Sequence, residues 1–326
     1  MGQAQTLALR DLQDSVPLAS LALSRAGVTR SSKSVRLRLP EGERVLSASI
    51  ECFAELSADQ KGVHMSRFEE IVNESIEAVV SGPAMAIDEV AEQIAREVVS
   101  RQNSRRGEAQ VRVEYPVMRM TPVTNLPSEE TYQLIASASA TPDGARRLTG
   151  ASAQGMNACP CAQELVQARA EQELATRGFT SDELERIFAA VPGATHNQRS
   201  RGTLLVGTSN GLSIDPDLLI AIIEDAMSSE IYELMKRPDE QWVVEKAHRR
   251  PRFVEDSVRE MIRGVVDRLP ELPDDAFVHA HQANFETIHA HDVDADRWGL
   301  LYGMRRELVG ERVEEDGLTP EQWLRS

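Results

Sequence analysis

Hydrophobic and polar residues in the first half of the chain alternate with two different periods. Four stretches alternate between apolar and polar positions, which is typical of strands with one buried face. Two stretches between them repeat apolar residues every three to four positions, which predicts amphipathic helices. The strand-like stretches cover residues 35–39, 46–52, 111–117 and 134–140, and the helical ones cover residues 66–80 and 87–98. The predicted order of elements is therefore ββααββ.

The second half predicts the same order of elements without obvious sequence identity to the first half. The expected strands cover residues 154–158, 202–208 and 276–285, and the expected helices cover residues 215–231 and 253–266. A helical insert is expected over residues 162–190, directly after Cys159-Pro160-Cys161. The charge pattern of residues 294–313 favours a helix over a strand.

Two tandem ββααββ modules make an α+β protein with an antiparallel sheet and helices on one face. We divide the chain into a flexible tail (1–17), a first module (18–150), a second module (151–293) and a C-terminal segment (294–326). Such a sheet leaves edge strands exposed, and soluble proteins pair or cover these edges. We therefore expect subunits to pair edge to edge in a closed ring.

Composition and charge narrow the range of partners. The 326 residues carry a formal net charge of −16, which repels the phosphate backbone of nucleic acids and acidic membrane surfaces. No apolar run is long enough to span a bilayer, and the N-terminus lacks the pattern of a signal peptide. We therefore expect a cytoplasmic protein with neither a nucleic acid nor a membrane as partner. Three cysteines, two of them separated by a single proline, favour metal or redox chemistry over a disulfide framework.

Candidate chemistry gathers at the predicted ends of strands. Cys159 and Cys161 follow a strand, and the proline between them makes it unfavourable for both thiols to bind one metal ion. His196 begins a loop rich in amides and arginines, which suits an anion, while Glu286 and His289 follow the last predicted strand. A thiol, imidazoles and a carboxylate together suit Zn²⁺, Fe²⁺ or Mn²⁺. The residues alone thus predict either metal-assisted hydrolysis or thiol chemistry on a small anionic substrate.

Other charged positions have mixed interpretations. Lys236 and Arg237 are expected to end a helix, where cations suit the helix dipole, whereas Asp239 and Glu240 have no such capping explanation. Glu255 lies in the first turn of a predicted helix, where a negative charge is favourable. We assign three further histidines to the surface, namely His248, His279 and His281.

Six motifs in sequence order resemble those of the type IB GTP cyclohydrolases. They are Lys61-Gly62-Val63-His64-Met65-Ser66-Arg67, Cys159-Pro160-Cys161, His196-Asn197-Gln198-Arg199, Lys236-Arg237-Pro238-Asp239-Glu240, Phe253-Val254-Glu255-Asp256 and Glu286-Thr287-Ile288-His289. The resemblance extends from about Leu21 to His291. It implies the tunnelling fold (T-fold), with two ββααββ modules in each chain and a homotetramer whose active sites lie at subunit interfaces. The long helical insert between Cys159 and His196 resembles the archaeal methanopterin branch, which is typically iron-dependent.

The resemblance also implies roles for individual residues. Glu255 is the implied purine anchor, because one carboxylate can accept from both N1–H and N2–H₂ of guanine. Cys161 supports the site or oxidises reversibly with Cys159. The implied metal ligands are Cys159, His196, Glu240 and His289, with Fe(II) expected and Mn(II) or Zn(II) as alternatives. The implied catalytic set is Cys159, Cys161, His196 and Glu240, and the further substrate contacts are Glu286, His64, Arg67, Arg199, Arg201, Lys236 and Arg237.

The implied activity is metal-dependent hydrolysis of GTP at C8 of the guanine ring, with release of formate. The product is 7,8-dihydroneopterin 2′,3′-cyclic phosphate in the archaeal branch and 7,8-dihydroneopterin triphosphate in the folate branch. Two alternatives stay open. The first is a nitrile reductase on the same fold, which uses a cysteine nucleophile and NADPH, and the second is a non-catalytic protein that binds a metal or a purine.

Overall fold

The computed structural model describes residues 13, 15–81, 83–209, 211–314 and 317–326. Most of the tail predicted over residues 1–17 therefore lies outside the described residues. The chain divides into two compact units, which are described separately below. Unit 1 comprises residues 1–38, 42–112 and 136–147, and unit 2 comprises residues 39–41, 113–135 and 148–326.

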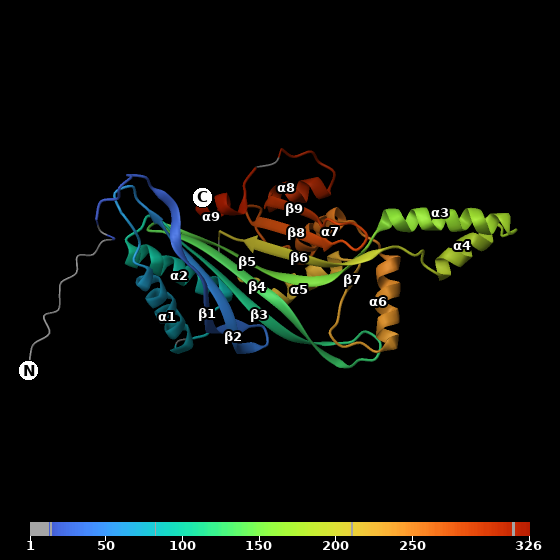
Figure 1. The fold of residues 1–326 in the computed structure, drawn as a ribbon, viewed down its shortest axis with the longest axis horizontal. Helices are drawn as coiled ribbons and strands as arrows, with labels where there is room; N and C mark the ends of the chain where they lie inside the picture. Colours follow the sequence, from blue (N-terminus) through green and yellow to red (C-terminus); the bar gives the residue numbers. More distant parts are fainter. Residues whose placement is uncertain (1–12, 14, 82, 210, 315–316) are drawn as a thin grey trace, which may run out of the picture. The chain divides into compact units, whose positions relative to one another are not determined.

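Unit 1 contains the paired strands and helices that begin the chain (Figure 1). Phe68 and Ile71 of its first helix and Ile94 and Val98 of its second are fully buried, as expected for amphipathic helices packed on a sheet. Gly107 allows a close approach, because a Cβ there would lie 2.3 Å from a backbone oxygen of the second helix. The elements are β1 (Leu23–Leu39), β2 (Gly42–Leu56), α1 (Met65–Ser81) and α2 (Ile87–Gln102), followed by β3 (Gly107–Met120), which ends in unit 2, and β4 (Pro127–Thr141), which begins in unit 2.

Unit 2 contains the rest of the elements, and its strands β5, β6, β8 and β9 form consecutive antiparallel pairs. The elements are β5 (Gly144–Ala158), which begins in unit 1, α3 (Pro160–Thr176), α4 (Ser181–Ala190), β6 (Asn197–Gly207), α5 (Pro216–Ala226), β7 (Ser229–Glu230), α6 (Arg237–Arg249), α7 (Val254–Arg268), β8 (Phe277–Phe285), β9 (Val293–Leu300), α8 (Leu301–Leu308) and α9 (Pro320–Arg325). The predicted insert forms the helical pair α3 and α4, in which no residue is buried.

Helices α5 and α7 cover one face of these strands. Gly202 of β6 faces this helical layer, because a Cβ added at Gly202 would lie 2.4 Å from the side chain of Ile223 in α5. At one end of the unit, Trp323 of α9 is 2% exposed and packs against Leu148 and Phe277. No helix of the described residues is both long enough and apolar enough to cross a lipid bilayer.

The predicted fold class, a tunnelling fold with two tandem ββααββ modules and helices on one face, is wrong. The strands form a nine-stranded sheet in the order β1-β2-β3-β4-β5-β6-β8-β9, with β7 beside β5. Between β6 and β8 the chain does not run through two helices alone but through α5, β7, α6 and α7. The physical reason is that Ser229 and Glu230 leave the predicted helix to pair with Met156 and Gly155.

The C-terminal segment also differs from the prediction. Residues 294–313 were expected to form a helix, but Val293–Leu300 forms strand β9, and only Leu301–Leu308 is helical. Strand β9 pairs with β8 along its whole length, and Asp294 and Asp296 project from the exposed face of this last strand. Charges on an exposed strand face resemble the polar side of a helix in sequence, which explains the error.

Candidate active site

Cys159 and His196 lie opposite one another where β5 ends and β6 begins. Cys159 is the N-cap of α3, and Pro160 occupies the first turn of this helix. The backbone N–H of Cys159 donates to the carbonyl oxygen of His196 at 3.1 Å, which extends the β5–β6 ladder by one step beyond Ala158. The Thr195 hydroxyl donates to the carbonyl oxygen of Cys159 at 2.7 Å. Directly opposite residues of an antiparallel pair have Cβ atoms about 4.5–5.5 Å apart, so both side chains can reach one ligand.

Glu286 brings a carboxylate to the same end of the sheet. Its Oε1 accepts from Nε2 of Gln198 at 3.0 Å, and its Oε2 lies 3.7 Å from Nδ1 of His196. The next residue, Thr287, donates its hydroxyl hydrogen to the carbonyl oxygen of Asn197 at 3.0 Å, which ties the loop after β8 to the start of β6. Only 6% of the Glu286 side chain and 12% of the His196 side chain are exposed. The pair is therefore held in a largely desolvated position.

Two buried polar atoms of this pair have no hydrogen-bond partner among the described residues: Nδ1 of His196 and Oε2 of Glu286. The ring of His289 stands edge-on to that of His196, with the ring centroids 6.3 Å apart. His289 itself is exposed and stacks on His291. Cys159, His196, His289 and Glu286 offer sulfur, nitrogen and oxygen donors, which are the types that suit a borderline divalent metal ion. No three of these donor atoms lie within 4.8 Å of one another among the described residues, so binding of an ion would have to draw them together.

A buried network of amides and hydroxyls supports this end of the sheet. Asn157 is fully buried in β5, and its Nδ2 donates to Oγ of Ser257 at 3.0 Å and to Oδ1 of Asn284 at 3.2 Å. Its Oδ1 accepts from the backbone N–H of Ser228 at 3.0 Å. Ser257 lies in the first turns of α7, and Asn284 lies near the end of β8. Asn157 thus joins three elements that carry predicted site residues, and no sequence motif pointed to it.

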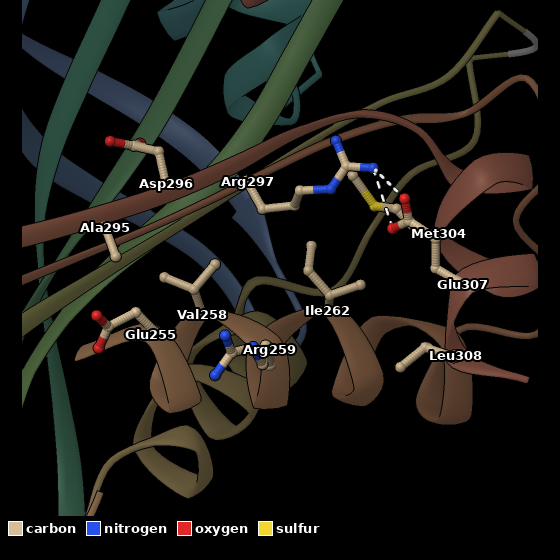
Figure 2. Close-up of a pocket in the computed structure, with 10 residues that line it drawn as sticks. All are labelled: Glu255, Val258, Arg259, Ile262, Ala295, Asp296, Arg297, Met304, Glu307 and Leu308. Atoms are coloured by element: carbon tan, nitrogen blue, oxygen red, sulfur yellow. Dashed lines mark hydrogen bonds and ion pairs between the residues drawn. The ribbon is translucent and has the colours of Figure 1, made fainter. Parts of the chain in front are cut away.

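Glu255 occupies a different position, in the first turn of α7 at the edge of a pocket (Figure 2). The pocket has a volume of about 450 Å³ and lies between α7, β9 and α8. Val258 and Ile262 supply part of its apolar lining, while Arg297 and Glu307 form an ion pair of 3.1 Å across it. A carboxylate beside apolar walls can accept hydrogen bonds from the N–H groups of a flat ligand.

The two carboxylates at the start of α6 have different environments. Asp239 is fully buried and accepts hydrogen bonds from the backbone N–H groups of Val123 and Thr124, both at 2.9 Å, and from that of Lys236 at 3.0 Å. Burial raises the pKa of Asp239, but the hydrogen bonds, led by those of Thr124, outweigh it and hold the pKa below its usual range. Glu240 is exposed. The prediction that Asp239 has no capping role is therefore wrong, because its side chain accepts from the backbone N–H of the N-cap residue Lys236. Of the two carboxylates, Glu240 is the one that solvent can reach.

The predicted cationic contacts lie in several places. Arg199 and Arg201 project from the face of β6 opposite to Gln198, and Arg199 donates to Gln154 at 3.3 Å. Lys236 and Arg237 begin α6, so the prediction that they end a helix is wrong. In unit 1, His64 and Arg67 lie at the start of α1, where the backbone N–H of Arg67 donates to the carbonyl oxygen of His64 at 3.0 Å. The side-chain amide of Gln102 forms hydrogen bonds with the backbone N–H and carbonyl oxygen of His64.

Comparison with known proteins reveals relatives over almost the whole chain. A family model described as type I GTP cyclohydrolase folE2 matches residues 9–295. The chain belongs to this family. GTP cyclohydrolase MptA of Methanococcus aeolicus is 37% identical over 305 residues, which cover 91% of this chain and 99% of the relative. GTP cyclohydrolase MptA of Methanosarcina mazei is 37% identical over 312 residues, which cover 93% and 98%.

Uricases are among the solved structures with a similar fold. A hyper-thermostable mutant of AgUricase superimposes with a TM-score of 0.50 at 10% sequence identity, covering 90% of this chain and 95% of that one. The uricase of Arthrobacter globiformis gives a TM-score of 0.49. At this identity the likeness to the mutant concerns the fold alone. This structural likeness does not support the tunnelling fold with two tandem modules, which the sequence motifs had implied.

Proposed function

We propose that this chain is a GTP cyclohydrolase that opens the imidazole ring of guanine in GTP at C8 and releases formate in pterin biosynthesis. Membership of the type I GTP cyclohydrolase family supports this proposal. The observation that carries it is that Cys159, His196 and Glu286, which are far apart in the sequence, meet at one end of the sheet with His289 beside them. The GTP cyclohydrolase relatives favour this activity over a nitrile reductase or a non-catalytic binding protein.

The proposed product is 7,8-dihydroneopterin 2′,3′-cyclic phosphate, with the triphosphate as the alternative. The long insert between Cys159 and His196, which forms α3 and α4, supports the cyclic phosphate because it resembles the archaeal branch. Chromatography of the product before and after phosphatase treatment distinguishes the two compounds, because only the linear triphosphate loses its phosphates directly to a monoesterase.

A divalent metal ion is part of the proposal, with Fe(II) first and Mn(II) or Zn(II) as alternatives. Cys159, His196 and His289 would hold it, together with the accessible Glu240. The unpartnered Nδ1 of His196 and Oε2 of Glu286 support a role for Glu286 in orienting the histidine ring through Nδ1. When bound, such an ion lowers the pKa of a water molecule and so supplies a nucleophile near neutral pH.

The remaining residues are proposed to bind the two ends of the substrate. The Glu255 carboxylate would accept two hydrogen bonds from guanine, at the pocket formed by α7, β9 and α8. Adenine lacks this pair of donors, so Glu255 would also give selectivity. The candidates for the phosphates and ribose are Arg199, Arg201, Lys236, Arg237, His64 and Arg67.

We also propose a homotetramer with active sites at subunit interfaces. Strand β9 is the last strand of the sheet, and the Glu255 pocket opens beside it, so a neighbouring subunit could complete the pocket. Multi-angle light scattering of active protein tests this proposal, and a monomeric mass at full activity would contradict it.

The proposed activity is tested by following formate release from GTP with protein purified without oxygen. Addition of Fe(II) to metal-free protein is expected to produce formate in a fixed ratio to the pterin product, while ATP should yield none. Absence of formate with every divalent ion tried, from protein that remains folded by circular dichroism, would refute the proposal.

A further inference from the structure

Two histidines and two aspartates form a ladder across strands β8 and β9, away from Cys159 and His196. One of them, Asp296, also lines the Glu255 pocket, but Figure 2 shows its carboxylate pointing away from that pocket. Nε2 of His279 lies 2.7 Å from Oδ1 of Asp296, and Nε2 of His281 lies 2.7 Å from Oδ2 of Asp294. The donor atoms of His281, Asp294 and Asp296 all lie within 4.8 Å of one another. Both histidines were expected at the surface, and no sequence motif assigns them a function.

The strand register explains why these four side chains meet. His281 is paired directly with Asp296, and His279 is paired with Trp298 two residues further on. Side chains two residues apart on a strand share a face, so all four project from one side of the β8–β9 ribbon. Gln282 is paired with Gly202, which faces α5, so the ladder lies on the face away from that helix.

The ladder is accessible but partly shielded. Exposed fractions of the side chains are 20% for His279, 29% for His281, 30% for Asp296 and 58% for Asp294. The ring of Trp298 stands edge-on to that of His279 with the centroids 5.7 Å apart, which limits the rotation of this imidazole. The donors are therefore preorganised on a rigid sheet and can still be reached from solvent.

We propose that His281, Asp294 and Asp296 bind a divalent transition-metal ion such as Zn²⁺, at a site away from Cys159 and His196, while His279 holds Asp296 in place. One imidazole nitrogen and two carboxylate oxygens supply three ligands of a tetrahedral ion and leave the fourth position to water. The two carboxylates balance its charge. Unlike the candidate active site, this set contains no thiol and lies between two adjacent strands.

Small movements would convert the three donors into ligands. Two ligands on one tetrahedral Zn²⁺ are about 3.3 Å apart, given bond lengths of about 2.0–2.1 Å. The His281–Asp294 contact of 2.7 Å would therefore widen by roughly 0.6 Å as the ion replaces the shared proton. The Asp294 side chain is 58% exposed, so it has room to rotate.

The test counts Zn²⁺ bound by the full chain after equilibrium dialysis at defined free Zn²⁺, measured by elemental analysis. The Cys159→Ser variant serves as the parent, because it lacks the thiol of the candidate active site. His281→Asn combined with Asp296→Asn removes two of the three proposed donors while keeping similar side-chain sizes. His248→Asn is the matched control, because His248 is a partly exposed histidine on α6 whose Nδ1 contacts the carbonyl oxygen of Val244.

The Cys159→Ser parent is expected to bind one Zn²⁺ per chain and to gain thermal stability from it, because an ion that binds only the folded state stabilises that state. The double substitution in this parent should abolish both effects, and His248→Asn should change neither. Equal Zn²⁺ binding with and without the double substitution, or no Zn²⁺ bound by a folded parent, would overturn the proposal. Neither outcome depends on GTP cyclohydrolase activity.

Discussion

Replacement of Asn157 by alanine tests whether the buried network supports the candidate active site. In Asn157→Ala, the buried backbone N–H of Ser228 loses its acceptor, at a cost of about 1–3 kcal/mol. Asn284 still accepts from Gln282 at 3.3 Å, and Ser257 still donates to a backbone oxygen, so these two groups add little to the cost. The void left by the amide adds about 1 kcal/mol. We expect a total loss of about 2–4 kcal/mol in the free energy of unfolding.

Urea unfolding measures this loss as a lower midpoint at an unchanged slope. Formate release from GTP should fall more steeply than stability predicts, because Asn157 joins the end of β5 to α7 and β8. Gln110→Ala is the matched control: its amide in unit 1 donates to Ser137 at 3.1 Å, and its loss should cost about 0.5–1.5 kcal/mol with activity retained. If Asn157→Ala matches this control in both stability and formate release, the network has no supporting role.

Three further predictions concern the metal and the guanine base. Cys159→Ser should lose most of the active-site metal and nearly all formate release, since a hydroxyl is a poor ligand near neutral pH. Cys161→Ser should keep both the metal and the activity. Elemental analysis that shows metal lost in Cys161→Ser and kept in Cys159→Ser would contradict the ligand assignment. Glu255→Gln should lower kcat/KM for GTP by an amount equivalent to about 2–5 kcal/mol, because the amide offers a donor where guanine also has a donor. The metal content should stay constant. An unchanged kcat/KM would show that Glu255 does not contact the base. Chelation should abolish formate release and Fe(II) or Mn(II) should restore it, while full activity in metal-free protein would exclude a metal-dependent mechanism.

Local patterns predicted the first half of the fold better than the second. Elements with one buried face, such as α2 over Ile87–Gln102, show clear periodicity, so their type follows from sequence. Strand β7 shows no such periodicity: it has two residues, and Ser229 is fully buried where β7 pairs with β5. The predicted helix over 215–231 accordingly ends early, at Ala226. The error arose where a distant strand, and not local propensity, determines the conformation.

The candidate site shows a similar division. The motifs containing Cys159, His196 and Glu286 indicated where chemistry-bearing residues lie, and the structure brings these three together. The buried state of Asn157 could not be predicted, because an asparagine in an alternating strand has no local signal that distinguishes a buried network from an exposed face. The roles of the metal ligands and of Glu255 stay predictions.

The neighbouring carboxylates of α6 show how a contact between distant segments selects the residue that is available for chemistry. Asp239 and Glu240 are equivalent in charge and differ by one methylene, so the sequence offers no ground for separating them. The turn at Val123 and Thr124 separates them physically: its N–H groups fix Asp239 as a buried acceptor, which also anchors the start of α6. The next residue along the helix then points elsewhere, because successive helical positions are rotated by about 100°. Glu240 therefore stays accessible as a metal ligand because Asp239 is bound by the turn. Weakening the turn should displace Glu240, even though Val123 and Thr124 are not among the proposed ligands.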